Sequence, residues 1–331
     1  MGNCCESTNN TKQITNGNNI NQVSKKSETI ENNTKNIQIH PRIFKLTNTL
    51  KGHQGKITCL KELNNTKLVT GSDEGEIKIW SLNDFSCEKT IKLESKIFCL
   101  LEFEPDKLLI GLSSNDIELR DISFISEELI QTYKGHKYWV TNLVKIDDDN
   151  FASASSDGEI RIWNYKTGEC ITIIDNEDVN ILSLIKLEDG NLCSGDINSK
   201  IKVWDWKDKS CIRSYLGQNG FIKCLCQLKN GQIVSGSDDN SIIVWNIEYG
   251  YYELKGHNKA IRDICQIDDD LIASASFDKT IKIWNLNERK CIDTLDGHND
   301  IVSGIIKHNI GVLISCSNDK TIKIWKRLPG Y

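Results

Sequence analysis

The stretch DKTIKIWKRLPGY, residues 319–331, decides the fold. Its first half has the alternating apolar pattern of a β-strand. An earlier stretch, DGEIRIWNYKTGECITII at residues 157–174, contains the same strand but continues through a turn into a further strand. The C-terminal copy has no residues for that further strand. Because a bare sheet edge leaves backbone donors and acceptors unpaired, we expect a strand from elsewhere in the chain to complete the last sheet.

The I-x-I-W strand recurs along the chain at a nearly constant interval. Its tryptophans are Trp80, Trp163, Trp204, Trp245, Trp284 and Trp325, and a degenerate copy, IELR, ends at Arg120. The seven positions are separated by 40, 43, 41, 41, 39 and 41 residues. A period near 41 residues with four short strands per unit is typical of a propeller blade. The sequence therefore predicts an all-β, seven-bladed β-propeller made of four-stranded antiparallel blades.

Polar residues precede each tryptophan at fixed distances. A hydroxyl lies ten residues before it, at Thr70, Ser153, Ser194, Ser235, Ser274 and Ser315. An acid lies six residues before it at Asp157, Asp239, Asp278 and Asp319, with Glu74 and Asn198 as variants. Gly-His pairs stand further upstream and contain His53, His136, His257 and His298. With these motifs the sequence resembles the WD-repeat family over about residues 43–326.

The resemblance implies that the His, Ser or Thr, Asp and Trp of one blade form a hydrogen-bonded tetrad. Such a tetrad satisfies a buried indole N–H and both nitrogens of a buried imidazole. Three blades have the complete set: His136, Ser153, Asp157 and Trp163 in blade 3; His257, Ser274, Asp278 and Trp284 in blade 6; His298, Ser315, Asp319 and Trp325 in blade 7.

The other blades depart from the tetrad pattern. Blade 1 has Glu74 in place of Asp, and blade 5 has Gln218 in place of His. Blade 4 lacks the His, and blade 2 lacks the His, the hydroxyl and the Trp. We expect blades 2 and 4 to be the least stable, through structural drift; a specialised surface is the alternative reading.

The missing last strand has a candidate near the N-terminus. Residues Ile43–Leu50 precede the first Gly-His in the same way that CIDTL, residues 291–295, precedes a later one. We expect Ile43–Leu50 to close the ring by completing blade 7, as is common in the family. Residues 42–331 then form one domain, and residues 1–41 form an Asn-rich, disordered tail.

Composition and charge exclude several classes of protein. The chain is 38% hydrophobic and 26% charged, and its net charge is −5. A nucleic-acid-binding protein normally carries a basic face, so we expect no nucleic-acid partner.

Four of the thirteen cysteines, Cys87, Cys170, Cys211 and Cys291, each follow a Trp by seven residues. They occupy one repeated slot in different blades, so they do not form a disulfide framework. The absence of a secretory leader implies a reducing compartment.

No motif for catalysis or cofactor binding is present. The sequence contains no GxSxG elbow, no phosphate-cradling glycine loop, no HExxH and no CxxC. The acidic runs Asp147–Asp149 and Asp268–Asp270 lack the ligand spacing of a calcium loop, which favours ordinary turns. We therefore predict a non-enzyme with no cofactor, no metal and no small-molecule substrate.

The N-terminus begins MGNCCES and resembles that of dually acylated proteins. Gly2 is the acceptor position for myristoylation, and Cys4 and Cys5 suit palmitoylation. Glu6 departs from the pattern, which has Ser or Thr at that position. Two acyl chains give stable membrane residence, whereas one gives only marginal binding. We expect attachment to the cytoplasmic face of a membrane; an unmodified tail and a cytosolic protein are the alternative.

The resemblance also implies where partners bind. In the family, peptides dock on the face formed by the loops before the innermost strands and between the second and third strands. For the loops before the innermost strands, the matching positions here are Trp139, Thr141, Phe221, Lys223 and Arg262. For the loops between the second and third strands, they are Ser156, Asp238 and Phe277. We predict that Trp139, Phe221, Lys223, Asp238, Arg262 and Phe277 bind a partner, because exposed aromatics with an Arg are typical of a hot spot. Packing against the neighbouring blade is an equal alternative for Trp139 and Phe277.

Two functions fit these features. The first is a monomeric, non-catalytic scaffold that binds proteins or peptides and is tethered to a membrane. The second is a soluble substrate receptor or adaptor of a cullin-type ubiquitin ligase. Some WD-repeat proteins dock such ligases through a W-D-x-R/K motif, which Trp204-Asp205-Trp206-Lys207 resembles. Asn198 stands where that motif has an acid.

Overall fold

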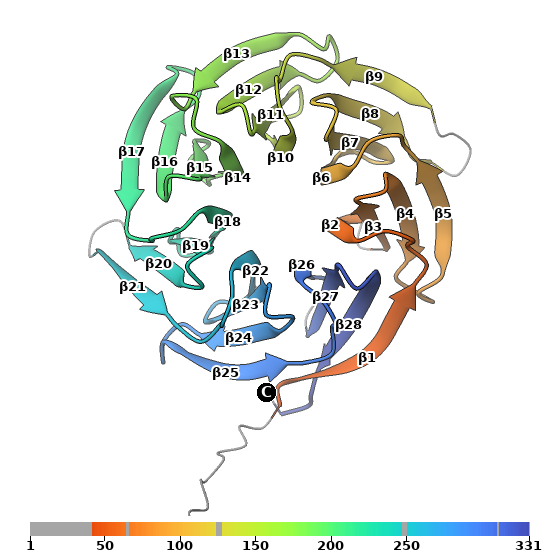
Figure 1. The fold of residues 1–331 in the computed structure, drawn as a ribbon, viewed down its shortest axis with the longest axis vertical. Coiled ribbons are helices and arrows are strands. Elements are labelled where there is room, and N and C mark those ends of the chain that lie inside the picture. The colour runs from red at the N-terminus through yellow and green to blue at the C-terminus, as the bar shows by residue number, and fades with distance from the viewer. Residues whose placement is uncertain (1–41, 64–65, 124–127, 247–249, 310, 331) are drawn as a thin grey trace, which may run out of the picture. The chain divides into compact units, whose positions relative to one another are not determined.

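The structure is a computed structural model, and it describes residues 42–63, 66–123, 128–246, 250–309 and 311–330. These residues form 28 strands in seven four-stranded antiparallel sheets, which are arranged as blades around a central axis (Figure 1). The all-β, seven-bladed fold is confirmed. The predicted tail, with Gly2, Cys4 and Cys5, lies outside the described residues. The described part of the chain contains no helix long and apolar enough to cross a membrane.

Each blade runs from an innermost strand at the axis to an outermost strand at the rim. Blade 1 comprises β2 (Ile57–Leu63), β3 (Lys67–Ser72), β4 (Glu76–Ser81) and β5 (Cys87–Lys92). Blade 2 comprises β6 (Ile97–Glu104), β7 (Lys107–Leu112), β8 (Ile117–Asp121) and β9 (Leu129–Tyr133). Blade 3 comprises β10 (Val140–Lys145), β11 (Asn150–Ser155), β12 (Glu159–Asn164) and β13 (Cys170–Asp175). Blade 4 comprises β14 (Ile181–Lys186), β15 (Leu192–Asp196), β16 (Lys200–Asp205) and β17 (Ser210–Leu216).

The remaining blades follow the same order. Blade 5 comprises β18 (Ile222–Gln227), β19 (Ile233–Ser237), β20 (Ile242–Asn246) and β21 (Gly250–Leu254). Blade 6 comprises β22 (Ile261–Asp268), β23 (Leu271–Ser276), β24 (Ile281–Asn285) and β25 (Lys290–Leu295). Blade 7 comprises β26 (Val302–Lys307), β27 (Val312–Ser317), β28 (Thr321–Arg327) and β1 (Phe44–Lys51).

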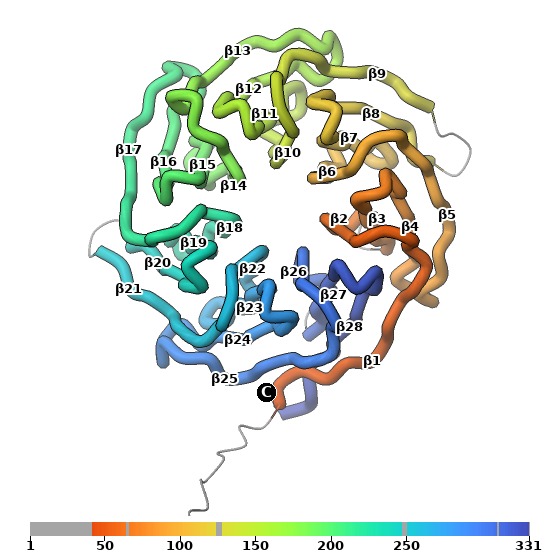
Figure 2. Tube along the Cα trace, viewed as in Figure 1, coloured from red at the N-terminus to blue at the C-terminus, as the bar shows by residue number. Residues whose placement is uncertain are grey.

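Blade 7 is built from both ends of the described chain. Strand β1 pairs antiparallel with β28, from Phe44 opposite Arg327 to Lys51 opposite Thr321 (Figure 2). The backbone N–H groups of Ile43 and Phe44 donate to Oδ2 of Asp293 in blade 6, at 2.7 and 3.1 Å. The predicted closure by Ile43–Leu50 is therefore confirmed, and its first residues are anchored to the neighbouring blade.

The hydrophobic core lies between neighbouring blades. One cluster joins Phe103 and Tyr133 of blade 2 to Phe151 and Trp163 of blade 3. Tyr165 stacks on Phe103 with ring centroids 3.9 Å apart, and its carbonyl accepts a 2.6 Å hydrogen bond from the Tyr133 hydroxyl. This aromatic packing supports blade 2, which has no tetrad of its own.

The repeated cysteines occupy one slot, as their spacing predicts. Each lies on an outermost strand opposite the tryptophan of its blade, at Cys87, Cys170, Cys211 and Cys291. All cysteines in the described ranges are free thiols. Burial raises the pKa of several of them, to about 11 for Cys59 and Cys226, so these thiols stay protonated and unreactive near neutral pH.

Candidate protein-docking face

The tetrads tie the loop before each innermost strand to the strands behind it. In blade 6, Nε1 of Trp284 donates to Oγ of Ser274 at 2.8 Å, and Nε2 of His257 lies 2.7 Å from the same oxygen. Nδ1 of His257 lies 2.7 Å from Oδ2 of Asp278. Since the carboxylate only accepts, Nδ1 carries the proton and Nε2 accepts from the serine hydroxyl. Blades 3 and 7 repeat this geometry at distances of 2.7 to 2.9 Å.

The glycine of the Gly-His pair has a steric role. A Cβ atom placed on Gly256 would lie 3.1 Å from Cη2 of Trp284, and one on Gly297 would lie 3.1 Å from Cη2 of Trp325. Both distances are tighter than ordinary carbon contacts. The indole therefore occupies the space that a larger residue before the histidine would need.

Blade 1 places a different acid from the predicted one beside its histidine, without a hydrogen bond between them. Nδ1 of His53 lies 3.4 Å from Glu76, which stands four residues before Trp80, and Glu76 also accepts the N–H of Gln54. The assignment of Glu74 to this role is wrong: the acid beside the imidazole is Glu76, the first residue of β4, and Glu74 lies in the turn before that strand. Burial, together with Lys78, lowers the pKa of His53 to about 4.

Blade 5 has Gln218 in place of the histidine but keeps a continuous chain of hydrogen bonds from the Trp to the Asp. Oε1 of Gln218 accepts from Ser235 at 2.6 Å, and Ser235 accepts from Trp245 at 2.8 Å. Nε2 of Gln218 donates to Ser241, whose hydroxyl donates to Asp239 at 2.6 Å. An amide and a hydroxyl together thus span the distance that one imidazole spans in blade 6.

Blades 2 and 4 have no continuous tetrad. In blade 4 the pair Trp204–Ser194, at 2.8 Å, is separate from the pair Asn176–Asp196, at 3.3 Å. Within the described residues, Oδ1 of the fully buried Asn176 has no hydrogen-bond partner. In blade 2 the hydroxyl position holds Ile110, which is fully buried.

One tetrad also groups three residue types that can bind metals. His136, Asp157 and Glu159 bring ligand atoms within 4.8 Å of one another. Both ring nitrogens of His136 are engaged, by Asp157 and Ser153, and Glu159 pairs with Arg161 at 2.7 Å. The bonds of the tetrad therefore use the atoms that a metal would need.

The acidic runs form turns and ion pairs. Asp147 accepts the N–H of Asp149 at 2.9 Å, and Asp149 pairs with Lys166 at 2.9 Å. Asp268 pairs with Arg327, and Asp269 pairs with Lys229. The first run thus forms a turn, as predicted, whereas the second run also joins blade 6 to blades 5 and 7 through ion pairs.

A β-bulge shapes the mouth of the central channel in every blade. Near its start, each innermost strand skips one residue in its pairing with the second strand. The skipped residues are Thr58, Phe98, Thr141, Leu182, Lys223, Arg262 and Ser303. A bulge re-aims a side chain away from the ladder. Thr58, Thr141 and Ser303 use their hydroxyls to reach a carbonyl of the next blade, at 2.5 to 2.8 Å. The other four blades place larger side chains there.

These larger side chains border a cavity of about 430 Å³ on the same face. Its lining includes Phe98, Trp139, Leu182, Phe221, Lys223, Arg262 and Phe277, from blades 2 to 6. Trp139 is 52% exposed and Phe221 is 43% exposed, which is unusual for large rings. A concave, mainly apolar site with a few polar groups is the usual form of a binding site.

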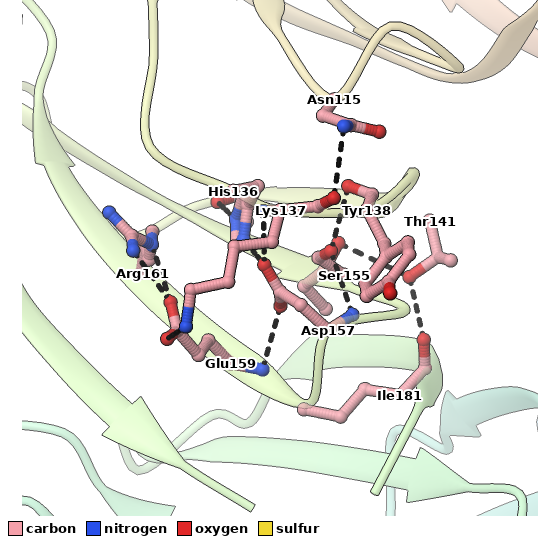
Figure 3. Close-up of polar contacts among 12 residues, drawn as sticks. Asn115, His136, Lys137, Tyr138, Thr141, Ser155, Asp157, Glu159, Arg161 and Ile181 are labelled. Carbon is pink, nitrogen blue, oxygen red and sulfur yellow. Dashed lines mark hydrogen bonds and ion pairs between the residues drawn. The ribbon is translucent and has the colours of Figure 1, made fainter. Parts of the chain in front are cut away.

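The loop that carries Trp139 is held rigidly by the tetrad of blade 3 (Figure 3). The N–H of Lys137 donates to Asp157 at 2.8 Å, and the hydroxyl of Ser155 donates to the carbonyl of Tyr138 at 3.0 Å. From blade 2, the side-chain amide of Asn115 donates to the carbonyl of Lys137 at 3.0 Å. The indole also stacks on Phe98, with ring centroids 5.3 Å apart. Because its backbone is fixed, Trp139 can contact a partner with little loss of entropy.

Five of the six predicted partner-binding residues line this one cavity. The sixth, Asp238, is not a lining residue, but it pairs with the lining residue Lys223 at 3.2 Å. The packing alternative holds for one face of the Trp139 ring, which stacks on Phe98 of blade 2, while half of the residue stays exposed; partner binding by Trp139 stays a prediction. Sequence reasoning missed Phe98, Asn180, Leu182 and Ile197, which also line the cavity. They belong to blades 2 and 4, where no Gly-His pair marks the position.

Comparison with known proteins agrees with the geometry. The family model described as "WD domain, G-beta repeat" matches residues 44–81, 127–164, 209–246, 251–285 and 289–326, more than half of the chain. The chain belongs to the WD40 family. The matched WD40 segments end just after the tryptophans of blades 1, 3, 5, 6 and 7, and they omit the two copies that end at Arg120 and Trp204. WD40 propellers typically bind other proteins and are generally non-catalytic.

Curated relatives share only part of their length with this WD40 protein. It is 23% identical over 31% of its chain to "DENN domain and WD repeat-containing protein SCD1" from Arabidopsis thaliana, covering 9% of that protein. It is 28% identical over 29% of its chain to "Ribosome biogenesis protein WDR12 homolog" from Drosophila mojavensis, covering 23%. It is 29% identical over 27% of its chain to "E3 ubiquitin-protein ligase COP1" from Pisum sativum, covering 14%. The chain thus spans less than a quarter of each of these relatives.

Proposed function

We propose that this WD40 protein is a non-catalytic scaffold that docks a peptide segment of a partner protein in the cavity bordered by Trp139, Phe221 and Phe277. The observation that carries this proposal is that the exposed rings of blades 3 and 5 and the half-buried ring of blade 6 line one cavity. Partners lose most binding free energy when such buried aromatic anchors are removed. The propeller supplies a rigid frame that keeps the rings in place.

The docking proposal is tested by affinity capture from detergent-solubilised membranes. The wild-type chain is compared with the double variant Trp139→Ala, Phe277→Ala. A control double variant, Ile212→Ala with Leu216→Ala, removes apolar side chains that are 48% and 68% exposed on the outer strand β17. We expect the first variant to lose the captured partner and the control to retain it, with unchanged circular dichroism. Full capture by the first variant would place docking on another surface.

We further propose that acyl chains on Gly2, Cys4 and Cys5 hold the propeller at the cytoplasmic face of a membrane. The support is the MGNCCES sequence, since these residues lie outside the described ranges. A myristoyl chain alone binds reversibly, and a palmitoyl chain makes residence stable. The lysines Lys12, Lys25, Lys26 and Lys35 are too dispersed to provide a polybasic signal.

Membrane tethering is tested by fractionation and mass spectrometry of the N-terminal peptide. We expect Gly2→Ala to move the protein to the soluble fraction, and Cys4→Ser with Cys5→Ser to leave a weak, exchanging membrane pool. An unmodified N-terminus, or a Gly2→Ala protein that fractionates like the wild type, would refute the tether. The cytosolic form of the scaffold would then replace it.

The alternative function is that of a substrate receptor or adaptor of a cullin-type ubiquitin ligase. Two observations favour keeping it: the W-D-x-K motif, and a relative whose name includes "E3 ubiquitin-protein ligase". In the motif, Asp205 accepts the N–H of Lys207 at 2.9 Å, and the Lys207 ammonium lies 5.7 Å from the Trp206 ring. A cavity of about 370 Å³ adjoins this turn. Co-purification of a cullin that is lost in Lys207→Ala would support this function.

A further inference from the structure

Two basic side chains stand among the seven bulged residues, and only one of them has an ion-pair partner within the described part of the chain. Among the seven bulged residues only Lys223 and Arg262 are ionised, and both line the docking cavity. Lys223 is neutralised, because its ammonium pairs with Asp238 at 3.2 Å and lies 5.0 Å from the Phe221 ring. Arg262 forms neither a hydrogen bond nor an ion pair with any of the described residues.

The nearest acid along the strand is committed elsewhere. Asp263 follows Arg262 on β22, but its Oδ1 accepts the N–H of Ile264 at 2.9 Å. Its Oδ2 accepts the N–H of Ile305 in blade 7 at 2.8 Å. These bonds direct the carboxylate toward the joint between blades 6 and 7. The positive charge of Arg262 opposes the rise that burial causes in the pKa of Asp263, but no hydrogen bond or ion pair joins the two side chains, so the guanidinium remains available at the cavity.

The surroundings of Arg262 define the chemistry of a ligand. No acid is among the residues that line the cavity, and its walls carry Trp139, Phe221 and Phe277. An Arg beside apolar walls binds a carboxylate in a planar, bidentate manner, and the partly dry setting strengthens the pair. The rings would hold an apolar side chain next to that carboxylate.

We infer that the docking cavity selects an acidic peptide segment, in which an Asp or Glu pairs with Arg262 and an adjacent large apolar side chain packs between the rings. This inference rests on the proposed docking function and adds the chemistry of the partner. A cavity of about 430 Å³ accepts a few side chains of an extended segment, not a folded domain.

The available charge favours a carboxylate over a phosphate. A phosphoryl group carries close to two negative charges near neutral pH and is normally met by a cluster of arginines. Here Arg262 is the single unpaired cation among the described residues that line the cavity, since Lys223 already pairs with Asp238. One guanidinium matches one carboxylate.

The test selects peptides from a phage-displayed library of random 12-residue sequences on the purified full chain. The same selection is made on Arg262→Gln and on the control Arg213→Gln, which removes an exposed arginine from the outer strand β17. Dissociation constants are then measured for a selected synthetic peptide, for a copy with each acid replaced by its amide, and for a copy with phosphoserine in place of the acid.

We expect acids beside an apolar residue to be enriched on the wild type and on Arg213→Gln, but not on Arg262→Gln. The amide copy should bind the wild type about tenfold or more weakly, and it should bind Arg262→Gln as the acidic peptide does. Selected peptides that need Trp139 and Phe277 but tolerate the amide change would overturn the acidic preference alone. A phosphoserine copy that binds more than tenfold tighter would overturn the choice of a carboxylate. Peptides that bind the Trp139→Ala, Phe277→Ala variant normally would overturn the docking face itself.

Discussion

A tetrad residue stabilises the blade through the partners it satisfies. The hydroxyl of Ser274 accepts from Trp284 and donates to His257, so removing any one member leaves a buried polar group without its partner. Blade 5 shows that the connection matters more than the imidazole, because Gln218 and Ser241 provide it without a titratable group. Blade 6 has Thr280 in the position of Ser241, and its hydroxyl donates to Asp278 at 2.7 Å.

This equivalence predicts outcomes of different size for two changes at His257. We expect His257→Ala to lower the free energy of unfolding by about 1–3 kcal/mol, because Ser274 and Asp278 lose a buried partner. We expect His257→Gln to lose much less, since the amide can bridge Ser274 and Thr280 as in blade 5. Equilibrium urea unfolding at pH 7 measures both. The control Asn258→Ala alters the exposed neighbouring side chain; if it is as destabilising as His257→Ala, the loop and not the tetrad is responsible.

Protonation gives a second prediction at the same residue. Burial lowers the pKa of His257 below its usual 6.5, although Asp278 opposes the shift. The unfolded chain therefore protonates His257 more readily than the folded chain does. As a result, the free energy of unfolding decreases as the pH falls below 6.5. Because His257→Gln removes this term, its stability relative to the wild type should rise between pH 7 and pH 5. Parallel pH profiles for the two proteins would contradict the shift.

Strand β1 is the element that turns an open row of blades into a ring. It covers the edge of β28 and buries Phe44, which is 1% exposed, against blade 6. The loss of a buried Phe side chain alone costs about 3–5 kcal/mol. An uncovered β28 would also present a row of free backbone groups for intermolecular pairing.

Deletion of residues 1–51 should therefore lower the melting temperature sharply or cause aggregation, whereas deletion of residues 1–38 should leave both unchanged. The physical reason is that only the longer deletion removes β1. Differential scanning calorimetry and light scattering compare the two proteins with the full chain. Equal melting of the two truncated proteins would show that the pairing of β1 with β28 contributes little.

The anchor of β1 can be tested separately from the strand itself. Asp293 accepts the N–H groups of Ile43 and Phe44 and joins blades 6 and 7. We expect Asp293→Ala to cost about 1–3 kcal/mol, because two buried N–H groups lose a charged acceptor. Hydrogen exchange should locate the effect at β1. A global loss of stability without faster exchange at β1 would argue against a local anchor.

At the scale of the whole molecule, the seven similar sheets differ in the buried hydrogen bonds and packing that stabilise them. Blade 6 has a continuous tetrad, blade 4 has two separate pairs and an unsatisfied amide oxygen, and blade 2 relies on aromatic packing. Local opening is easiest where fewer buried bonds must be broken. We therefore expect the backbone amides of β6–β9 and β14–β17 to exchange faster than those of β22–β25. Mass spectrometry of deuterated peptides measures this; uniform exchange around the ring would show that closure makes the propeller one cooperative unit.

The sequence by itself determined the blade count, the closing strand and most of the tetrads, because these depend on local periodicity. The spacing of tryptophans sets the repeat, and the polar residues that support each indole stand at fixed distances from it. The spacing rule failed at Glu74, because the acid that lies beside His53 is Glu76, which has the same side chain but stands at the start of β4.

Only the tertiary structure decided how the docking face is composed. Ring closure brings together residues from blades 2 to 6 that lie up to about 180 positions apart, and the bulges aim Phe98, Leu182 and Arg262 at one cavity. No local pattern marks Phe98 or Leu182, because their blades lack the Gly-His pair. Likewise, whether an Arg is paired depends on which acids reach it across blades. Three-dimensional packing pairs Asp238 with Lys223 but directs Asp263 to the backbone of blade 7, so that Arg262 has no ion pair with it; sequence periodicity does not encode this difference.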